Sequence, residues 1–168
     1  LLLPTSPGYD TARRIWNGAI DRHPACIARC TGVADVVAAV RFARERDLEI
    51  AVRGGGHNVA GTAVCDDGIV IDLSAMRAVW VDPAGRAALV QGGALGGDVD
   101  RETQLHGLAA VLGFVSATGI AGLTVGGGFG YLTRRHGWTC DNVQSMEVVT
   151  AAGQVLRVSE REHADRPH

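Results

Sequence analysis

Residues 49–58 read Glu49-Ile50-Ala51-Val52-Arg53-Gly54-Gly55-Gly56-His57-Asn58, a short β-type run followed by three glycines and a histidine. Glycine lacks a Cβ and reaches positive φ without strain, so three successive amides can turn toward one ligand. Such a row of amides forms a nest for anionic groups. The stretch therefore predicts a strand that ends in a loop able to hold the pyrophosphate of a nucleotide cofactor. His57 projects from this loop, although a histidine taken alone is more often satisfied by nearby main chain.

The composition is that of a globular protein, with 168 residues, 46% of them apolar and 20% charged, and a net charge of -2. All 16 basic residues are arginine. This excludes chemistry that needs a lysine amine, such as a P-loop lysine or a Schiff base. Nucleic acid is not expected as a partner, because no basic stripe or tail is present. The 23 glycines occur in clusters, which indicates main chain close to a ligand.

Hydrophobic periodicity predicts short strands that end in glycine loops. The apolar spacing from Val33 to Ala43 predicts an amphipathic helix with Thr31 as its N-cap. A second, short helix is expected from Asp98 to Leu105. A third short helix is expected to end at Arg134-Arg135-His136, because cations are favourable at a helix C-terminus. Strands are expected at 49–53, 68–73, 79–82 and 88–91, with a hairpin formed by 143–150 and 154–158. The fold class is therefore α+β.

The stretch from Gly107 to Thr133 carries no charge, so a membrane-spanning helix has to be considered. Its eight glycines argue against one, because each interior glycine costs a helix about 1 kcal/mol. No signal peptide is visible, and the start at Leu1 without a methionine indicates an N-terminus that is not native. We expect a soluble protein, with a cytoplasmic location favoured and no membrane partner.

The four cysteines and the unassigned histidines show no ligand spacing for a metal. Cys26, Cys30, Cys65 and Cys140 lack a C-x-x-C pair and are expected to be free thiols, with Cys65 and Cys140 buried. The histidines without a carboxylate or cysteine partner at ligand spacing are His23, His106, His163 and His168. No metal site is expected.

Five glycine-containing or polar motifs follow the first loop in a fixed order, although no G-x-G-x-x-G fingerprint of a Rossmann domain occurs. They are Asp72-Leu73-Ser74, Gln91-Gly92-Gly93, Thr118-Gly119-x-x-Gly122, Gly126-Gly127-Gly128-Phe129-Gly130 and Val148-Val149-Thr150. From about Tyr9 to Asp165, this series resembles the FAD-binding domain of the berberine-bridge-enzyme-like oxidases. These belong to the vanillyl-alcohol-oxidase and p-cresol-methylhydroxylase (PCMH) superfamily.

The resemblance implies a PCMH-type FAD-binding domain made of two small α+β subdomains and incomplete at its C-terminus. Residues 1–168 would be this domain, and the substrate domain would be absent from the chain. The cofactor-binding residues implied are Arg53, Gly54, Gly55, Gly56, His57, Asn58, Asp72, Ser74, Gly92, Val115, Thr118, Gly119, Gly122, Gly126, Gly127, Gly128, Gly130 and Val149. In that family the histidine matching His57 is bonded to the flavin 8α carbon, and a neutral imidazole is a competent nucleophile.

Many members of the family carry a second link, from a cysteine eleven residues before the glycine triplet. Val115 occupies that position here, so the chain resembles the singly histidyl-linked branch. Three polar residues keep two interpretations. Arg53 could place charge near the pyrophosphate or the reduced, anionic flavin, or it could be structural. Asp72 and Ser74 could lie near the cofactor, or Asp72 could only cap the turn before Met76. Asp141-Asn142 reads as a simple turn.

The function implied is the oxidation of an alcohol, a sugar or a cyclic amine by hydride transfer to covalent FAD, with O2 as a candidate electron acceptor. The catalytic base would lie on the following domain, so none is assigned, and the fragment alone is expected to be inactive. Two alternatives remain. One is a noncovalent FAD reductase of the same fold that resembles UDP-N-acetylenolpyruvoylglucosamine reductase. The other is a non-catalytic FAD-binding fragment.

Overall fold

A three-stranded parallel sheet organises the first half of the chain. The computed structural model describes residues 1–159, and its first sheet has the order β1-β3-β2. The strands are β1 (Cys26–Arg29), β2 (Ile50–Arg53) and β3 (Ile69–Asp72). The central strand β3 pairs Ile69 with both Cys26 and Ile50, and Asp72 with both Arg29 and Arg53. The three strands therefore end in register, at the edge where the glycine loop begins.

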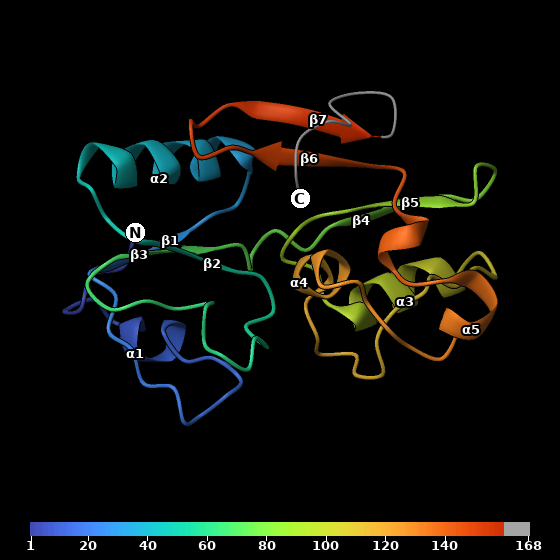
Figure 1. Ribbon diagram of the computed structural model, residues 1–168, viewed down its shortest axis with the longest axis horizontal. Helices are drawn as coiled ribbons and strands as arrows, with labels where there is room; N and C mark the ends of the chain where they lie inside the picture. Colours follow the sequence, from blue (N-terminus) through green and yellow to red (C-terminus); the bar gives the residue numbers. More distant parts are fainter. Residues whose placement is uncertain (160–168) are drawn as a thin grey trace.

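Helices cover both faces of this sheet, with α2 (Val33–Glu45) on one face and α1 (Tyr9–Ala12) on the other (Figure 1). Alternate residues of each strand point to opposite faces. The face toward α2 buries Cys26, Ile69 and Ile71 with Ala39, Val40 and Ala43 of the helix. The opposite face buries Ile27, Ala51 and Val70 with Tyr9, Val64 and Cys65. The sheet is thus apolar on both sides, as a covered parallel sheet must be.

The start of α2 corrects one prediction. Gly32, in an extended conformation, is the N-cap, and no side chain caps the helix. Thr31 instead donates from its amide and its hydroxyl to Oδ2 of Asp35, each at 2.8 Å. These hydrogen bonds hold the pKa of Asp35 below its ordinary value. Thr31 is therefore a partner of Asp35 and was wrongly predicted as the cap.

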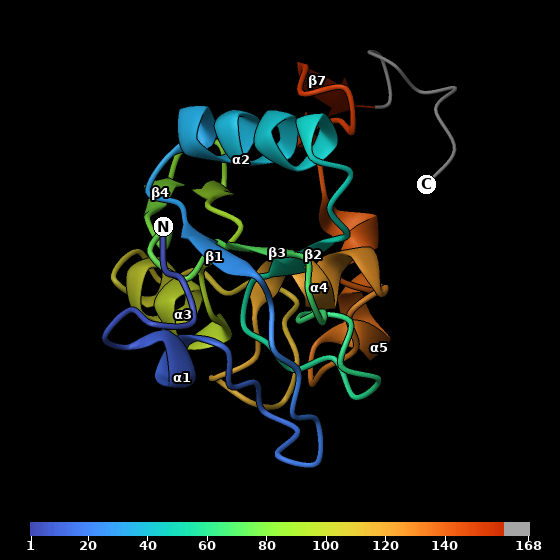
Figure 2. The same cartoon turned by 90° about the vertical axis from the view of Figure 1, so that its left-hand side faces the viewer.

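A second subdomain follows, built from a hairpin and short helices around long loops. Its elements are β4 (Val79–Asp82), β5 (Ala87–Val90), α3 (Gly96–Gln104), α4 (Ile120–Val125), α5 (Thr133–His136) and the 3-10 turn η1 (Cys140–Asn142). Strands β4 and β5 pair antiparallel. The view in Figure 2 shows α3, α4 and α5 on the side of the sheet away from α2.

The last hairpin crosses back to the first subdomain. Strands β6 (Ser145–Val149) and β7 (Val155–Ser159) pair antiparallel, and β6 reaches α2 (Figure 1). Val149 packs on the hydrophobic cluster formed by α2 and the parallel sheet. This hairpin therefore ties the end of the described chain to the first core.

The α+β class is confirmed, and the described chain forms the two subdomains that were expected. The strands and hairpin expected from the sequence are present, while β1, α1 and α4 were not predicted. No helix among residues 1–159 is long and apolar enough to cross a membrane. The stretch 107–133 holds only the six-residue α4 and the start of α5, because its glycines interrupt longer helices.

Candidate functional site

Glycine loops from both subdomains meet at one place. A Cβ on Gly55 would lie 2.6 Å from Cα of Gly119, and one on Gly54 would lie 3.1 Å from the carbonyl oxygen of Gly92. A Cβ on Gly119 would likewise lie 2.8 Å from Cα of Gly55. Separations below 3 Å from main chain exclude a side chain, so the close approach requires glycine at Gly55 and Gly119. The structure therefore brings together three of the predicted glycine motifs, which are separate in the sequence.

The loop amides of this junction have no hydrogen-bond acceptor within the described chain. Among the hydrogen bonds formed within residues 1–159, none is donated by the main-chain amides of Gly54 to Asn58 or of Gly119. The neighbouring amides are used, since Ile120 donates to Ala94 and Gly96 donates to Thr118. Thr118 thus frames the junction through its carbonyl group. A row of open amides at the end of a strand has the chemistry of an anion-binding nest.

His57 adjoins these amides, and the two nitrogens of its ring differ. Nδ1 lies 3.0 Å from the carbonyl oxygen of Gly55. Because a carbonyl only accepts hydrogen bonds, this contact fixes the proton on Nδ1. Nε2 is buried and has no hydrogen-bond partner in the described part of the chain. A buried lone pair without a partner is costly, and here it belongs to a nucleophilic nitrogen.

The segment after α1 holds the histidine loop from outside. The Trp16 ring stacks on the His57 ring, with centroids 4.7 Å apart and planes inclined by 19°. The Trp16 amide donates to the Gly56 carbonyl at 3.0 Å. Sequence reasoning missed Trp16, because this contact joins two distant segments and no motif surrounds the tryptophan.

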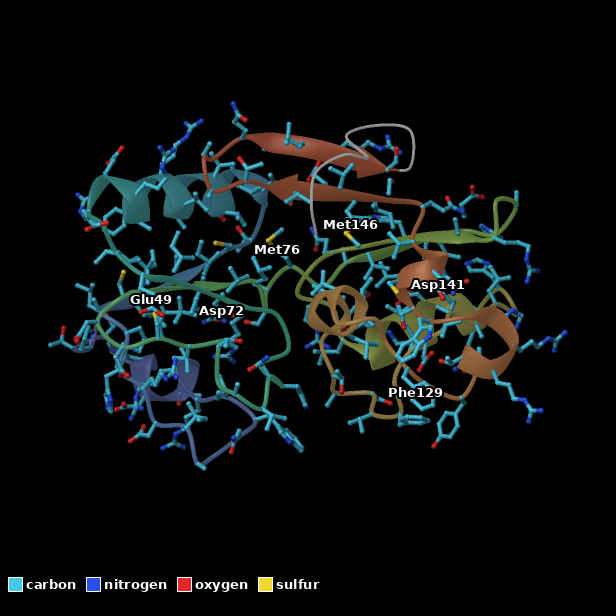
Figure 3. The ribbon with its side chains drawn as sticks, in the orientation of Figure 1. Glu49, Asp72, Met76, Phe129, Asp141 and Met146 are labelled. Carbon is cyan, nitrogen blue, oxygen red and sulfur yellow. The ribbon has the colours of Figure 1, made fainter. Side chains whose placement is uncertain are left out.

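The predicted polar residues Arg53, Asn58, Asp72 and Ser74 have structural partners. The Arg53 guanidinium donates to the Ala12 carbonyl and lies 3.9 Å from Asp72. The Asp72 carboxylate is buried at the end of β3 and accepts the Ser74 amide at 3.0 Å (Figure 3). The Asn58 side chain accepts the Thr62 amide at 3.2 Å. These contacts favour the turn-forming interpretation of Asp72 and the structural interpretation of Arg53.

The glycine triplet serves a different junction, separated from Gly119 by α4. Gly128 has a φ of 76°, and a Cβ there would overlap the Thr139 side chain. Gly127 has a φ of 97° and faces the Trp138 ring, while Gly130 lies against the Leu112 carbonyl. Contacts with Trp138 and Thr139, which lead into η1, and with the Leu112 main chain account for these three glycines. Their contact with a cofactor stays a prediction.

The remaining predicted positions lie at the edges of the site. Gly122 has open space around its Cα, and Gly126 caps the end of α4. Val115 is 52% exposed, in the loop whose Ser116 carbonyl accepts the Gly97 amide. Val149 is partly buried and packs on the core cluster formed by α2 and the parallel sheet. The structure does not bring Val149 to the glycine junction.

All four cysteines are free thiols. Burial raises the pKa of Cys30 to about 11 and also raises the pKa values of Cys26 and Cys65. Such thiols carry little thiolate and are poor nucleophiles. Cys140, predicted to be buried, is exposed. Its main chain begins the surface turn η1 and donates to the Gly127 carbonyl, which leaves the side chain outside.

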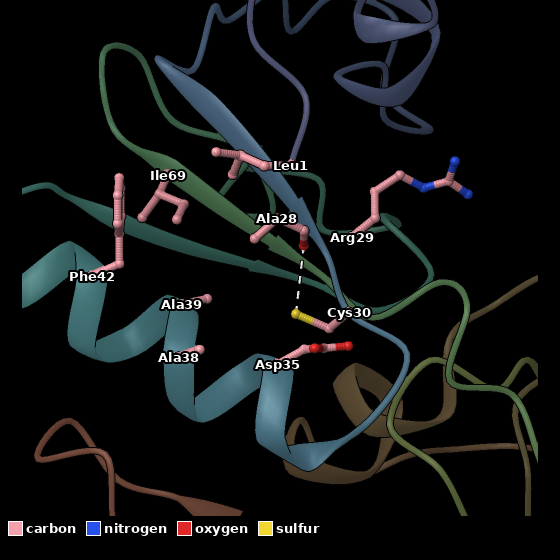
Figure 4. A pocket seen from close by; sticks show the side chains of 9 residues that line it. All are labelled: Leu1, Ala28, Arg29, Cys30, Asp35, Ala38, Ala39, Phe42 and Ile69. Atoms are coloured by element: carbon pink, nitrogen blue, oxygen red, sulfur yellow. Dashed lines mark hydrogen bonds between the residues drawn. The ribbon is translucent and has the colours of Figure 1, made fainter.

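Two further observations bear on other kinds of site. A pocket of about 270 Å³ lies between α2 and the sheet, lined by Ala28, Cys30, Ala39 and Phe42 among others, apart from the glycine junction (Figure 4). Within residues 1–159, no group of three or more His, Cys, Asp or Glu side chains could hold a metal ion. His163 and His168 lie outside the described residues.

The junction fits the diphosphate and flavin of FAD by its own features. In the described chain its loop amides donate no hydrogen bond, its glycines let two main-chain segments approach closely, and the His57 ring adjoins these amides. These are features that a site for a nucleotide cofactor requires.

Comparison with known proteins agrees with this geometry. A family model described as "FAD binding domain" matches residues 24–159. The (R)-6-hydroxynicotine oxidase of Paenarthrobacter nicotinovorans is 41% identical over 165 residues, which cover 98% of this chain and 36% of that protein. The chain therefore spans about a third of the length of this relative.

Solved structures give the same result. The wild-type berberine-bridge-enzyme-like protein 1 of Physcomitrella patens superposes with a TM-score of 0.89 at 28% identity, covering 97% of this chain and 36% of that one. The glucooligosaccharide oxidase of Acremonium strictum, whose structure contains 6-S-cysteinyl, 8α-N1-histidyl FAD, superposes with a TM-score of 0.88 at 33% identity, covering 96% and 34%. With fold, junction and relatives in agreement, the chain belongs to the FAD-binding domain family of the berberine-bridge-enzyme-like, FAD-linked oxidoreductases.

Proposed function

We propose that this chain is the FAD-binding portion of an oxidase that acts on an alcohol, a sugar or a cyclic amine, with FAD bonded to His57. The observation that carries the proposal is the position of the His57 imidazole beside the amides of Gly54 to Asn58, which donate no hydrogen bond in the described chain. The names of two relatives, a hydroxynicotine oxidase and a glucooligosaccharide oxidase, support the amine and sugar classes.

The chain's own contribution is to bind and orient the cofactor. The amides of Gly54, Gly55, Gly56 and Gly119 would hold the pyrophosphate, and His57 would hold the flavin. When bound, FAD accepts a hydride from the substrate carbon and passes the electrons to O2. The substrate pocket and the base that removes the substrate proton belong, in this proposal, to a separate substrate domain outside residues 1–168.

The proposed link is single. Val115 has no nucleophilic atom at the position of the family's second link, and burial makes the Cys26, Cys30 and Cys65 thiols unreactive. Cys140 is exposed, but it lies beyond the glycine triplet and outside the family's position for a second link. We therefore expect one flavin-bearing peptide.

The test uses the complete gene product, purified with its flavin and then denatured. Flavin fluorescence should remain with the protein band after denaturing electrophoresis and should disappear in His57→Ala. Proteolysis and mass spectrometry should place the flavin mass only on the peptide that contains His57. A wild-type protein that releases all its flavin on denaturation would instead support a noncovalent FAD reductase. Flavin on a peptide with Cys65 or Cys140 would contradict the single link.

A further inference from the structure

We propose that Trp16 is a positioning residue for flavin attachment, whose indole fixes the His57 imidazole and stabilises its charge while the imidazole forms the bond. This inference rests on the covalent link proposed above. It goes beyond that link by assigning a task to a side chain outside the glycine motifs. The indole lies on the face of the imidazole, with centroids 4.7 Å apart.

The main chain holds Trp16 in place independently of its ring. Its amide donates to the Gly56 carbonyl at 3.0 Å. The Asn17 side chain donates to the Val59 carbonyl at 2.9 Å, and the Arg53 guanidinium donates to the Ala12 carbonyl. Three hydrogen bonds therefore fasten the segment from Ala12 to Asn17 to the loop around His57. Removing the indole leaves all three, so a substitution at Trp16 tests the ring alone.

The exposure of Trp16 argues against an ordinary packing role. The residue is 70% exposed, whereas a tryptophan that stabilises a core is largely buried. Its one ring contact is with His57, among the aromatic pairs of the described chain. The indole thus covers one face of the imidazole and leaves its own other surface to solvent.

The bond-forming step shows what the indole would contribute. One ring nitrogen of His57 bonds to the 8α carbon, which loses one C–H proton. The imidazole then loses its N–H proton and becomes a neutral, alkylated ring. The electron pair of the broken C–H bond and these two protons pass to the flavin ring system, which is thereby reduced. O2 reoxidises it and is itself reduced to H2O2, so atoms and electrons balance.

The imidazole is positively charged between bond formation and loss of its N–H proton. The Gly55 carbonyl lies 3.0 Å from the ring at Nδ1, and the Trp16 ring stacks on the imidazole, so both face that charge. The face of an indole attracts a cation more strongly than other aromatic side chains do. Trp16 would therefore both orient the ring and favour the charged state.

The experiment measures attachment directly. The complete gene product is prepared without FAD from riboflavin-limited cells, FAD is added in air, and the covalent fraction is followed by mass spectrometry of denatured samples. Trp16→Ala should lower the rate of attachment about tenfold. The rate for Trp16→Phe should lie between those of wild type and Trp16→Ala, because a benzene ring binds cations more weakly than an indole. Noncovalent FAD affinity, measured on a His57→Ala background, should change little. The matched control is Trp80→Ala, because Trp80 is similarly exposed, at 55%, on β4.

Three results would overturn the inference. If Trp16→Ala attaches FAD as fast as wild type, the indole has no part in the step. If attachment slows only in proportion to a loss of noncovalent affinity, Trp16 has a merely structural role. If wild type never forms a covalent product, both the link and this role for Trp16 fail. The first two results leave the proposed function intact.

Discussion

Gly119 and Gly122 lie three positions apart, and we expect an added methyl group to change the stability of the protein differently at the two positions. A Cβ on Gly119 would lie 2.8 Å from Cα of Gly55, whereas one on Gly122, inside α4, would meet no atom within 4 Å. Gly119→Ala should therefore push the two loops apart, lower the free energy of unfolding by about 2–3 kcal/mol and abolish FAD retention. Gly122→Ala should be neutral or stabilise by up to about 1 kcal/mol, through its better helix propensity.

Thermal unfolding of the complete protein measures both effects on stability, and the flavin-to-protein ratio measures the loss of FAD in Gly119→Ala. For stability the pair is a matched control, since the two substitutions add the same atoms within one short segment. Equal losses of stability would show that Gly55 and Gly119 do not approach as closely as the structure has them.

The carboxylate of Asp98 fastens helix α3 to Arg77, in the segment that precedes β4. Nε and Nη2 of Arg77 donate to the two oxygens of Asp98 at 2.8 and 2.7 Å, and the same carboxylate accepts the Leu95 amide at 2.8 Å. The Arg77 hydrogen bond holds the pKa of Asp98 below its ordinary value. Asp98→Asn should lower stability by about 1–2 kcal/mol at pH 7, a modest figure because Arg77 is half exposed.

This contribution should depend on pH with a defined sign. Because the folded-state pKa of Asp98 is depressed, the stabilisation is complete above the ordinary aspartate pKa of 3.8 and is lost as the pH falls through the folded value. Urea unfolding at pH 7, 5 and 3 should show a constant difference between wild type and Asp98→Asn at the first two values and a smaller one at pH 3. Asp100→Asn, on the same helix, is the control. A difference that grows toward pH 3 would contradict the assignment.

Local patterns predicted most elements, but not those that depend on distant partners. Strands such as Ile69–Asp72 were found because apolar runs end at turn residues. Strand β1, only four residues long, becomes a strand through its pairing with β3, far along the chain. The helix α4 was missed because Gly122 lowers helix propensity there. The N-cap of α2 was predicted one residue too early, because the Thr31 hydroxyl donates a hydrogen bond to Asp35 instead of capping the helix.

In the candidate site too, the sequence predicted residues with a local signal and missed one that depends on a distant contact. The sequence predicted the loop at Gly54–His57 because three consecutive glycines have a direct conformational meaning. It also predicted Gly119, through a motif that follows the family pattern. The contact of Trp16 with His57 follows only from the path of the chain between α1 and β1. Spacing along the sequence carries no information about such a path.

The second subdomain of the molecule leaves large apolar side chains exposed. Trp80 and Leu89 form a directly opposed cross-strand pair on β4 and β5, with exposures of 55% and 69%. A cluster of touching aromatic rings, also exposed, is formed by Phe114, Phe129, Tyr131 and Trp138. Soluble monomers rarely leave such patches uncovered.

We therefore predict that residues 1–168 alone self-associate and do not act as an oxidase, because the chain spans 36% of its hydroxynicotine oxidase relative. Sedimentation velocity at micromolar concentration should show oligomers, and the double variant Trp80→Ser, Leu89→Ser should shift them toward monomer. Anaerobic addition of sugars, secondary alcohols or cyclic amines to the FAD-loaded chain should leave its flavin oxidised. A stable monomer whose flavin is bleached by one of these substrates would mean that the substrate site is built within these 168 residues.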